Sequence, residues 1–320
     1  MIFVNYCYFY PHMNSFQKVV ICALSLLVSG PLAGQDPELY YRLQTGESYS
    51  LVIDLQQSTN SESMEREEIS FYSLASLVFT VDTLHSNGDY TLGVFYEDLL
   101  ISMISPQMGI DISSASQKNP LLSEMVNRLE KENFQVLMSP AGELKEIRGL
   151  DLMFSDLETQ QGQDSLEQEV ILNTLNEAYG PDAFSSFFNL FVWIYPVISP
   201  MNNWTNDITY YFNTKAVKIV NRFVLSKARD DLLVIQGLGM LNANKEFYET
   251  TNMGKVKSSV SGSQTYDFQV DRHTGWLKKC VSRQRVLIET TILESKYFPS
   301  GLKIPSYTET VFEVKGSKLQ

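Results

Sequence analysis

The sequence is poor in the residues on which most metal centres and catalytic sites depend. It holds three cysteines and three histidines, and beyond residue 34 only Cys280, His85 and His273 remain. A single cysteine excludes an intramolecular disulfide in that part of the chain. Because no HExxH motif and no paired His or Cys spacing occurs, we expect no metal site.

The glycine-rich motifs that hold phosphates are also missing. Neither GxxxxGK[ST] nor GxGxxG occurs, so we expect no nucleotide and no other cofactor. The formal net charge of −12 repels phosphates. The most basic stretch, WLKKCVSRQR at 276–285, alternates as a solvated strand face does, and no nucleic-acid partner is expected.

The first 34 residues (1–34) are predicted to be an extension followed by a signal peptide. In Met13–Gly34, Lys18 supplies the positive charge, 19–28 an apolar core, and small residues follow. The preceding residues contain no Lys or Arg, which favours Met13 as the initiator. A membrane anchor is the alternative, but the apolar core is about half the roughly 20 residues that a spanning helix needs.

The end of this segment bears on anchoring. Residues 32–35 read LAGQ, one residue away from the LAGC that precedes a lipid-modified cysteine. Gln35 has no thiol, and Cys22 lies inside the apolar core after the bulky Ile21, where lipoprotein processing needs a small residue. We therefore expect a periplasmic or secreted protein that is not lipid-anchored and has no transmembrane segment after cleavage.

Residues 35–113 are predicted to be rich in β-structure. Apolar residues occupy every second position in SYSLVIDLQ (48–56) and again in EISFYSLASLVFTVD (68–82). Asn87-Gly88 then separates two alternating segments and predicts a hairpin, because both turn positions need positive φ.

Residues 114–190 are predicted to be a helical middle with one hairpin. Asn119 can cap a helix whose apolar stripe runs through 121–129. A second helix is expected at 166–179, where a capping box begins the segment and Gly-Pro ends it. Between them, a turn centred on Pro140-Ala141-Gly142 connects expected strands at 134–138 and 144–147.

Residues 191–320 return to strand-forming segments bounded by turn residues. Gly237 and Gly239 inside one of them indicate a bulge or a close approach. The order of elements predicts an α+β fold, with mainly antiparallel curved β-sheets in two β-rich halves around a helical middle segment. We expect 35–320 to be one compact unit, and a diverged duplication of the two halves stays open.

The stretch from Ala183 to Asn206 has no charged residue and many aromatic ones. One interpretation is a wall for an apolar ligand, since such pockets are built mainly of hydrophobic and aromatic side chains. The other is a helix and strand of the core, and the composition leaves open whether 184–204 lines a cavity or fills a core. The candidate ligand-binding residues are Phe187, Phe188, Phe191, Trp193 and Tyr195.

VDRHTGWL at 270–277 brings Asp271, His273 and Thr274 together in sequence, but Asp followed by Gly275 is more typical of a turn between strands. His85 precedes the predicted hairpin and is interpreted as a strand-end residue. No catalytic residue is assigned. A secreted hydrolase that uses carboxylates, or a serine with His85 or His273, is kept as the alternative.

Four segments together carry a resemblance: YYRLQTGESYSL (40–51), SNGDYTLGVFYEDLLISM (86–103), VLMSPAGELKEIRGLD (136–151) and VDRHTGWL. They resemble an uncharacterised family of secreted or lipid-anchored bacterial envelope proteins with a domain of unknown function. The resemblance implies two curved antiparallel sheets and brings no activity or catalytic residue. It also suggests, as an analogy of fold, the half-barrel lipid and lipoprotein carriers of the periplasm.

The function expected from these features is that of an exported, non-enzymatic envelope protein. It would bind an apolar small molecule, a lipid or an envelope protein through the concave side of a curved sheet.

Overall fold

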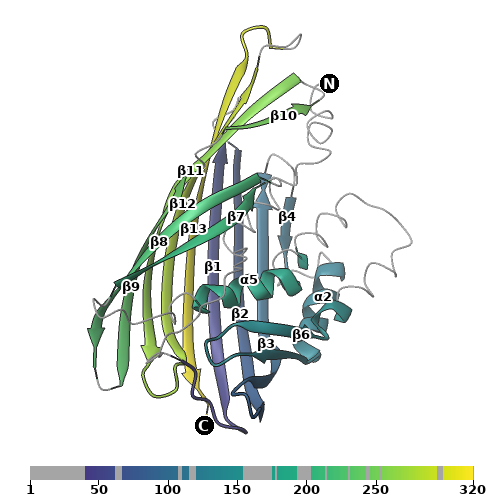
Figure 1. The fold of residues 1–320 in the computed structure, drawn as a ribbon. Coiled ribbons are helices and arrows are strands. Elements are labelled where there is room, and N and C mark those ends of the chain that lie inside the picture. The colour runs from purple at the N-terminus through teal and green to yellow at the C-terminus, as the bar shows by residue number, and fades with distance from the viewer. Residues whose placement is uncertain are drawn as a thin grey trace.

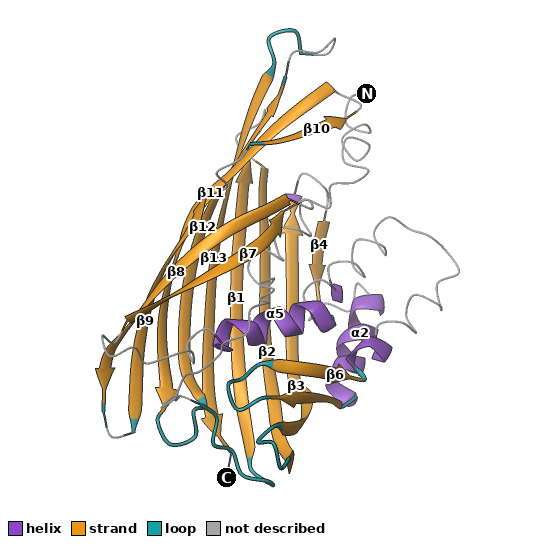
Figure 2. Ribbon diagram, in the orientation of Figure 1, coloured by secondary structure: helices purple, strands orange, loops and turns teal. Residues whose placement is uncertain are grey.

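The structure is a computed structural model, which describes residues 40–61, 67–106, 110–114, 120–153, 175–176, 179–192, 203–212, 215–229, 231–242, 246–251, 254–293 and 298–319. Within these ranges 69% of the residues lie in strands and 13% in helices. The strands form one antiparallel sheet, and Figures 1 and 2 show it as a single curved surface with the helices lying against it.

The elements follow the chain in two sets of strands. The first set and the two longer helices are β1 (Ser48–Ser61), β2 (Glu67–Leu84), β3 (Tyr90–Ser105), β4 (Ile110–Ser113), α2 (Pro120–Lys131), β5 (Phe134–Met138), β6 (Leu144–Arg148) and α5 (Pro181–Val192). The second set is β7 (Asn203–Phe212), β8 (Lys215–Ala228), β9 (Leu232–Asn242), β10 (Phe247–Thr251), β11 (Gly254–Asp271), β12 (Leu277–Ile292) and β13 (Leu302–Lys318).

The two sets of strands join along β1 and β13. The order across the sheet is β6-β5-β3-β2-β1-β13-β12-β11-β9-β8-β7, with β4 on β3 and β10 on β11. The antiparallel register of the junction places Tyr49 opposite Lys318 and Ser61 opposite Ser306. The first and last strands of the chain therefore lie side by side in the middle of the sheet.

The predicted α+β class, with two β-rich halves around a helical middle segment, is wrong. The described chain is mainly β and builds one large antiparallel sheet with three short helices. The hairpin of β5 and β6, inside the expected helical middle, pairs with β3 and extends the sheet. The helices lie on the sheet instead of dividing it, because β1 and β13 pair across more than 200 residues of chain.

Local predictions of turns and of the first helix agree with the structure. Gly88 has φ 87° between β2 and β3, and Gly142 has φ 84° between β5 and β6. Helix α2 covers the predicted stripe, and its Leu122, Met125 and Leu129 are buried. Most of the helix expected at 166–179 lies outside the described residues, although 175–176 and Tyr179 are helical.

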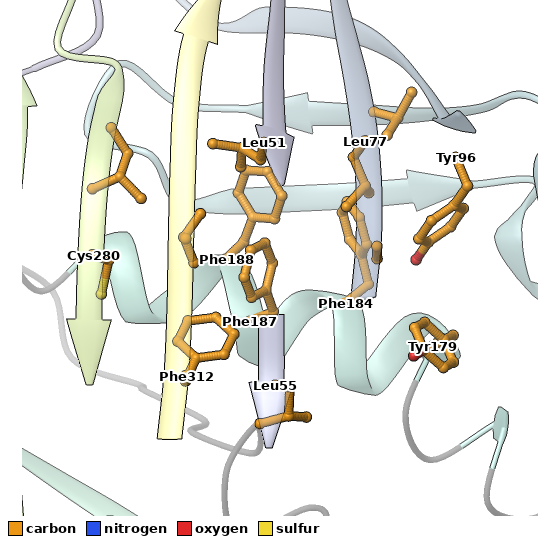
Figure 3. Close-up of a cluster of buried hydrophobic side chains, with 14 of the residues drawn as sticks. Leu51, Leu55, Leu77, Tyr96, Tyr179, Phe184, Phe187, Phe188, Cys280 and Phe312 are labelled. Atoms are coloured by element: carbon orange, nitrogen blue, oxygen red, sulfur yellow. The ribbon is translucent and has the colours of Figure 1, made fainter. Parts of the chain in front are cut away.

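One face of the sheet carries the core, and we call it the inner face. Alternate residues of the strands are buried on it, as in β1, where Tyr49, Leu51 and Leu55 belong to the hydrophobic core. Helix α5 packs on this face (Figure 3). None of the helices in the described ranges has the length and apolar content that crossing a membrane requires.

The segment before β1 ties together two turns at one end of the sheet. The backbone N–H of Tyr41 donates to Pro140 O, and that of Arg42 donates to Thr274 O, each at 2.8 Å. Trp276 is buried beside this segment, with its ring 5.9 Å from Tyr41 and 4.7 Å from Tyr49. This end of the inner face is consequently closed by packed aromatic rings.

Candidate functional site

Helix α5 presents an aromatic face to the sheet. Pro181 suits the first helical position, because its missing N–H would be unpaired there anyway, and Asp182 complements the positive end of the helix. Phe184, Phe187 and Phe188 are spaced three and four residues apart, which places them on one side of a helix. All three are buried.

Each of these rings packs on a different part of the sheet. Phe184 meets Phe134 of β5 with 5.0 Å between the ring centroids, and Phe188 meets Phe79 of β2 at 5.5 Å. Phe187 meets Phe312 of β13 edge to face, with 5.7 Å between the ring centroids, and Figure 3 shows the two side chains next to each other. The helix is thus held to the sheet through apolar side chains.

A cavity of about 40 Å³ lies between α5 and the inner face. The strands β1, β2, β3 and β13 and the helix supply its walls, which are apolar apart from three hydroxyl groups. The lining residues are Ile53, Leu55, Ser73, Ala75, Leu77, Tyr96, Tyr179, Ala183, Phe184, Phe187 and Phe312. Walls of mostly hydrophobic and aromatic side chains with a few polar groups also line the sites of apolar ligands.

The hydroxyl groups of this cavity remain uncharged. Tyr179 and Ser73 form a hydrogen bond between their hydroxyls, and the ring of Tyr96 lies 6.2 Å from that of Tyr179. Burial raises the pKa of Tyr96 and of Tyr179 well above the ordinary value of a phenol, because the charged form would lose its hydration. Among its described lining residues, the cavity therefore has neutral polar groups at one side and no charged side chain.

The structure places the five candidate residues as follows. Phe187 lines the cavity, whereas Phe188 is 1% exposed and packs between Phe79 and the neighbouring rings of α5. Phe191 belongs to α5, and Trp193 and Tyr195 lie outside the described residues. The first turns of the aromatic stretch thus do both things that the sequence left open, since they fill the core and line a cavity.

The sequence alone does not indicate several of the cavity residues. Ser73 and Tyr96 lie on the buried face of strands that alternate between apolar and polar residues, so the sequence predicts that they point inward. Nothing in the neighbouring sequence indicates which helix covers them. Phe312 lies almost 260 residues from Leu55 and is its direct partner across β1 and β13. Long-range pairing of this kind has no signal in one sequence.

The two histidines lie on separate exposed turns. His85 pairs through Nε2 with Oγ1 of Thr91 at 2.8 Å, beside the β2–β3 turn. His273 donates its backbone N–H to Asp271 Oδ1 in the turn between β11 and β12, where Gly275 has φ 74°. The interpretation of 270–277 as a turn is confirmed, and the structure does not bring either histidine into the cavity.

A metal site has no support in the described part of the chain, where no three His, Cys, Asp or Glu side chains are grouped to hold an ion. Cys280 is buried in the sheet, and burial raises the pKa of its thiol well above the ordinary value.

Comparison with known families gives one match, to a family of unknown function (DUF6263) over residues 87–277. No curated protein matches the chain. Among solved structures, lipovitellin, from a study of its lipid–protein interactions, is 9% identical with a TM-score of 0.47; the match covers 86% of this chain and 25% of lipovitellin.

OpdQ of Pseudomonas aeruginosa is 7% identical, with a TM-score of 0.21 and coverage of 87% of this chain and all of OpdQ. An outer membrane channel of Pseudomonas putida F1 is 10% identical, with a TM-score of 0.17 and coverage of 91% and 100%. This chain spans only a quarter of lipovitellin's length, and likenesses this distant do not assign a fold or a ligand.

Proposed function

We propose that this chain, a protein that belongs to the family of unknown function DUF6263, binds an apolar ligand between α5 and the inner face of its sheet. The main support for this proposal is the cavity between α5 and the inner face. Its walls are aliphatic and aromatic, and its hydroxyl groups are neutral. An acyl chain or another hydrocarbon gains its binding free energy from such walls through burial of apolar surface.

The ligand inserts between α5 and the inner face of the sheet at this cavity. At about 40 Å³ it has room for a few methylene groups, so a longer chain requires α5 to shift. The ladder hydrogen bonds of the sheet run between strands and do not involve α5. A shift of the helix therefore exchanges aromatic contacts for ligand contacts and leaves the sheet intact.

Two tryptophan substitutions on α5 test the site. Ala183 lines the cavity, whereas Ser185, two residues on, is part-exposed. The indole of Ala183→Trp would occupy the cavity and the space that a ligand needs beyond it, whereas Ser185→Trp would leave the cavity open. With N-phenyl-1-naphthylamine as a neutral fluorescent probe, we expect the wild type and Ser185→Trp to bind and Ala183→Trp to bind at least tenfold more weakly.

Circular dichroism and thermal unfolding of both variants separate binding from folding. Equal probe binding by a folded Ala183→Trp and the wild type would contradict the proposed site, and no binding by the wild type would contradict the function.

We also propose that the protein is exported and released. The support is the signal-peptide pattern of Met13–Gly34 and the Gln35 that stands where a lipoprotein has cysteine, in a part of the sequence outside the described residues. In a bacterial host, the wild type should fractionate as a released protein and Gln35→Cys should move to the membrane fraction. A membrane-bound wild type would refute release.

A further inference from the structure

A row of polar side chains crosses the inner face of the sheet, and we call it the polar row. Its members stand directly opposite one another on six neighbouring strands, from β8 to β1. The five members that have a polar side chain are buried, and each is between 0% and 8% exposed. The row consists of Asn221, Gly239, Gln264, Gln284, Thr310 and Gln57.

Part of the polar row is joined by hydrogen bonds. Nε2 of Gln264 donates to Oδ1 of Asn221 at 2.8 Å, and Nε2 of Gln284 donates to Oε1 of Gln264 at 3.0 Å. Gly239 makes the first bond possible, because a Cβ there would lie 2.2 Å from Oδ1 of Asn221 and 2.5 Å from Cγ of Gln264. The close approach that the sequence predicts at Gly239 is therefore one between the side chains of Asn221 and Gln264.

Other polar atoms of the row have no hydrogen-bond partner among the described residues. Among the described residues, four buried side-chain atoms lack a hydrogen bond, and all four belong to this row: Gln57 Oε1, Asn221 Nδ2, Gln284 Oε1 and Thr310 Oγ1. Buried polar atoms in folded proteins are nearly always paired, and each unpaired one destabilises the fold. Three of the four stand on adjacent strands, within about 10 Å of one another at the usual strand spacing.

This cluster lies next to the cavity. Gln57 follows Leu55 by two residues on β1, and Thr310 precedes Phe312 by two residues on β13. Leu55 and Phe312 both line the cavity. Residues two apart on a strand face the same side at a separation of about 7 Å, so unpaired polar atoms begin one step beyond the apolar walls.

In the described part of the sheet, the two rows that flank the polar row contain no charged side chain. Each flanking row runs across the same six strands, from β8 to β1, and consists of apolar, glycine or hydroxyl-bearing residues. One row is Phe223, Gly237, Tyr266, Ser282, Phe312 and Leu55. The other row is Ile219, Leu241, Gly262, Val286, Thr308 and Thr59. The one titratable group, Tyr266, is kept neutral because burial raises its pKa. A charged headgroup would lose its hydration here without a counterion.

We propose that the polar row binds the hydroxyl or ester groups of a neutral amphiphile whose hydrocarbon chain lies in the adjacent cavity. This inference rests on the proposed function and names the ligand class of that site. The side-chain carbonyl oxygens of Gln57 and Gln284 can accept hydrogen bonds from the hydroxyl groups of an acylglycerol. The hydroxyl of Thr310 can donate to its ester carbonyl or accept from a hydroxyl group.

Competition between two ligands with the same chain tests the class. 1-Oleoylglycerol and oleate share a hydrocarbon chain and differ in the charge of the head. With N-phenyl-1-naphthylamine bound to the full chain, we expect 1-oleoylglycerol to displace the probe at least tenfold more effectively than oleate. Equal displacement, or a preference for oleate, would overturn the inference while probe binding still supports the function.

Two threonines of β13 provide matched variants. Thr310 Oγ1 has no partner, whereas Thr308, one step along the same face, pairs with Thr59 at 3.1 Å. Thr310→Val should lower the preference for 1-oleoylglycerol by about threefold to tenfold, the value of one neutral hydrogen bond, without lowering the melting temperature. Thr308→Val should lower the melting temperature and leave the preference unchanged.

The outcomes separate the two proposals. If Thr310→Val keeps the full preference for 1-oleoylglycerol, the row does not contact the head and its atoms are satisfied by water. If the wild type binds the probe but not 1-oleoylglycerol, the ligand class is wrong and the apolar site stands. If the wild type binds neither, both proposals fall.

Discussion

Truncation of Phe188 to alanine tests the packing of α5 on the sheet. The side chain is 1% exposed, and its ring lies 5.5 Å from Phe79, 5.0 Å from Phe184 and 5.6 Å from Phe187. Phe188→Ala removes a buried ring and leaves a cavity, which usually lowers the free energy of unfolding by about 3 to 5 kcal/mol. The midpoint of thermal unfolding should fall by roughly 10 °C for a chain of this size.

Urea unfolding followed by circular dichroism would measure the change, with an unchanged m-value as the sign that the same surface is exposed. Tyr248→Ala is the control, because Tyr248 is 57% exposed and its loss should change stability by less than about 0.5 kcal/mol. If Phe188→Ala is no more destabilising than Tyr248→Ala, α5 is not packed on the inner face and the account of the site is wrong.

Further predictions concern the glycine, thiol and ion pair that the structure singles out. Gly239→Ala should destabilise the fold by about 1 to 3 kcal/mol in urea unfolding, because its Cβ would overlap Asn221; a neutral result would contradict the packing of the polar row. In a variant with Cys7→Ser and Cys22→Ser, Cys280 should react with Ellman's reagent only in the unfolded protein, and rapid labelling of the native state would contradict its burial. Lys145 hydrogen-bonds Asp89 at 2.7 Å and lowers the pKa of that carboxyl, so this pair stabilises the fold at neutral pH and the effect fades as the carboxyl is protonated in acid. Asp89→Asn should therefore lower stability by about 1 kcal/mol at pH 7, and the difference from wild type should shrink below about pH 4; a constant difference would refute the assignment.

The local elements of this fold are readable from the sequence. Asn87-Gly88 predicts the β2–β3 turn because Gly88 needs positive φ, and the stripe at 121–129 predicts α2. The alternation at 48–56 predicts the inner face of β1. Each of these signals is contained within a few residues, where backbone preference and amphipathic spacing decide the outcome.

The arrangement of these elements is not readable in the same way. The pairing of β1 with β13 turns two predicted halves into one sheet, and it depends on contacts between the two ends of the chain. The cavity follows from that pairing, since Leu55 and Phe312 come together only there.

One member of the polar row can be recognised in the sequence. Gln57 continues the buried alternation of Tyr49, Leu51, Ile53 and Leu55, so a polar residue stands at a position with buried parity. A strand that places glutamine on its buried face indicates either a buried network or a ligand. The sequence shows this one glutamine, but only the register of the strands shows that polar side chains occupy the same row on five strands, with Gly239 of β9 among them.

Mass spectrometry of organic extracts would show whether the space under α5 holds an apolar molecule. The protein and its Ala183→Trp and Ser185→Trp variants would be purified under identical conditions and extracted. We predict a neutral acyl-chain compound in stoichiometric amount from the wild type and Ser185→Trp, and its loss from Ala183→Trp. Extracts of the wild type without any such compound, or equal amounts from all three proteins, would contradict the account.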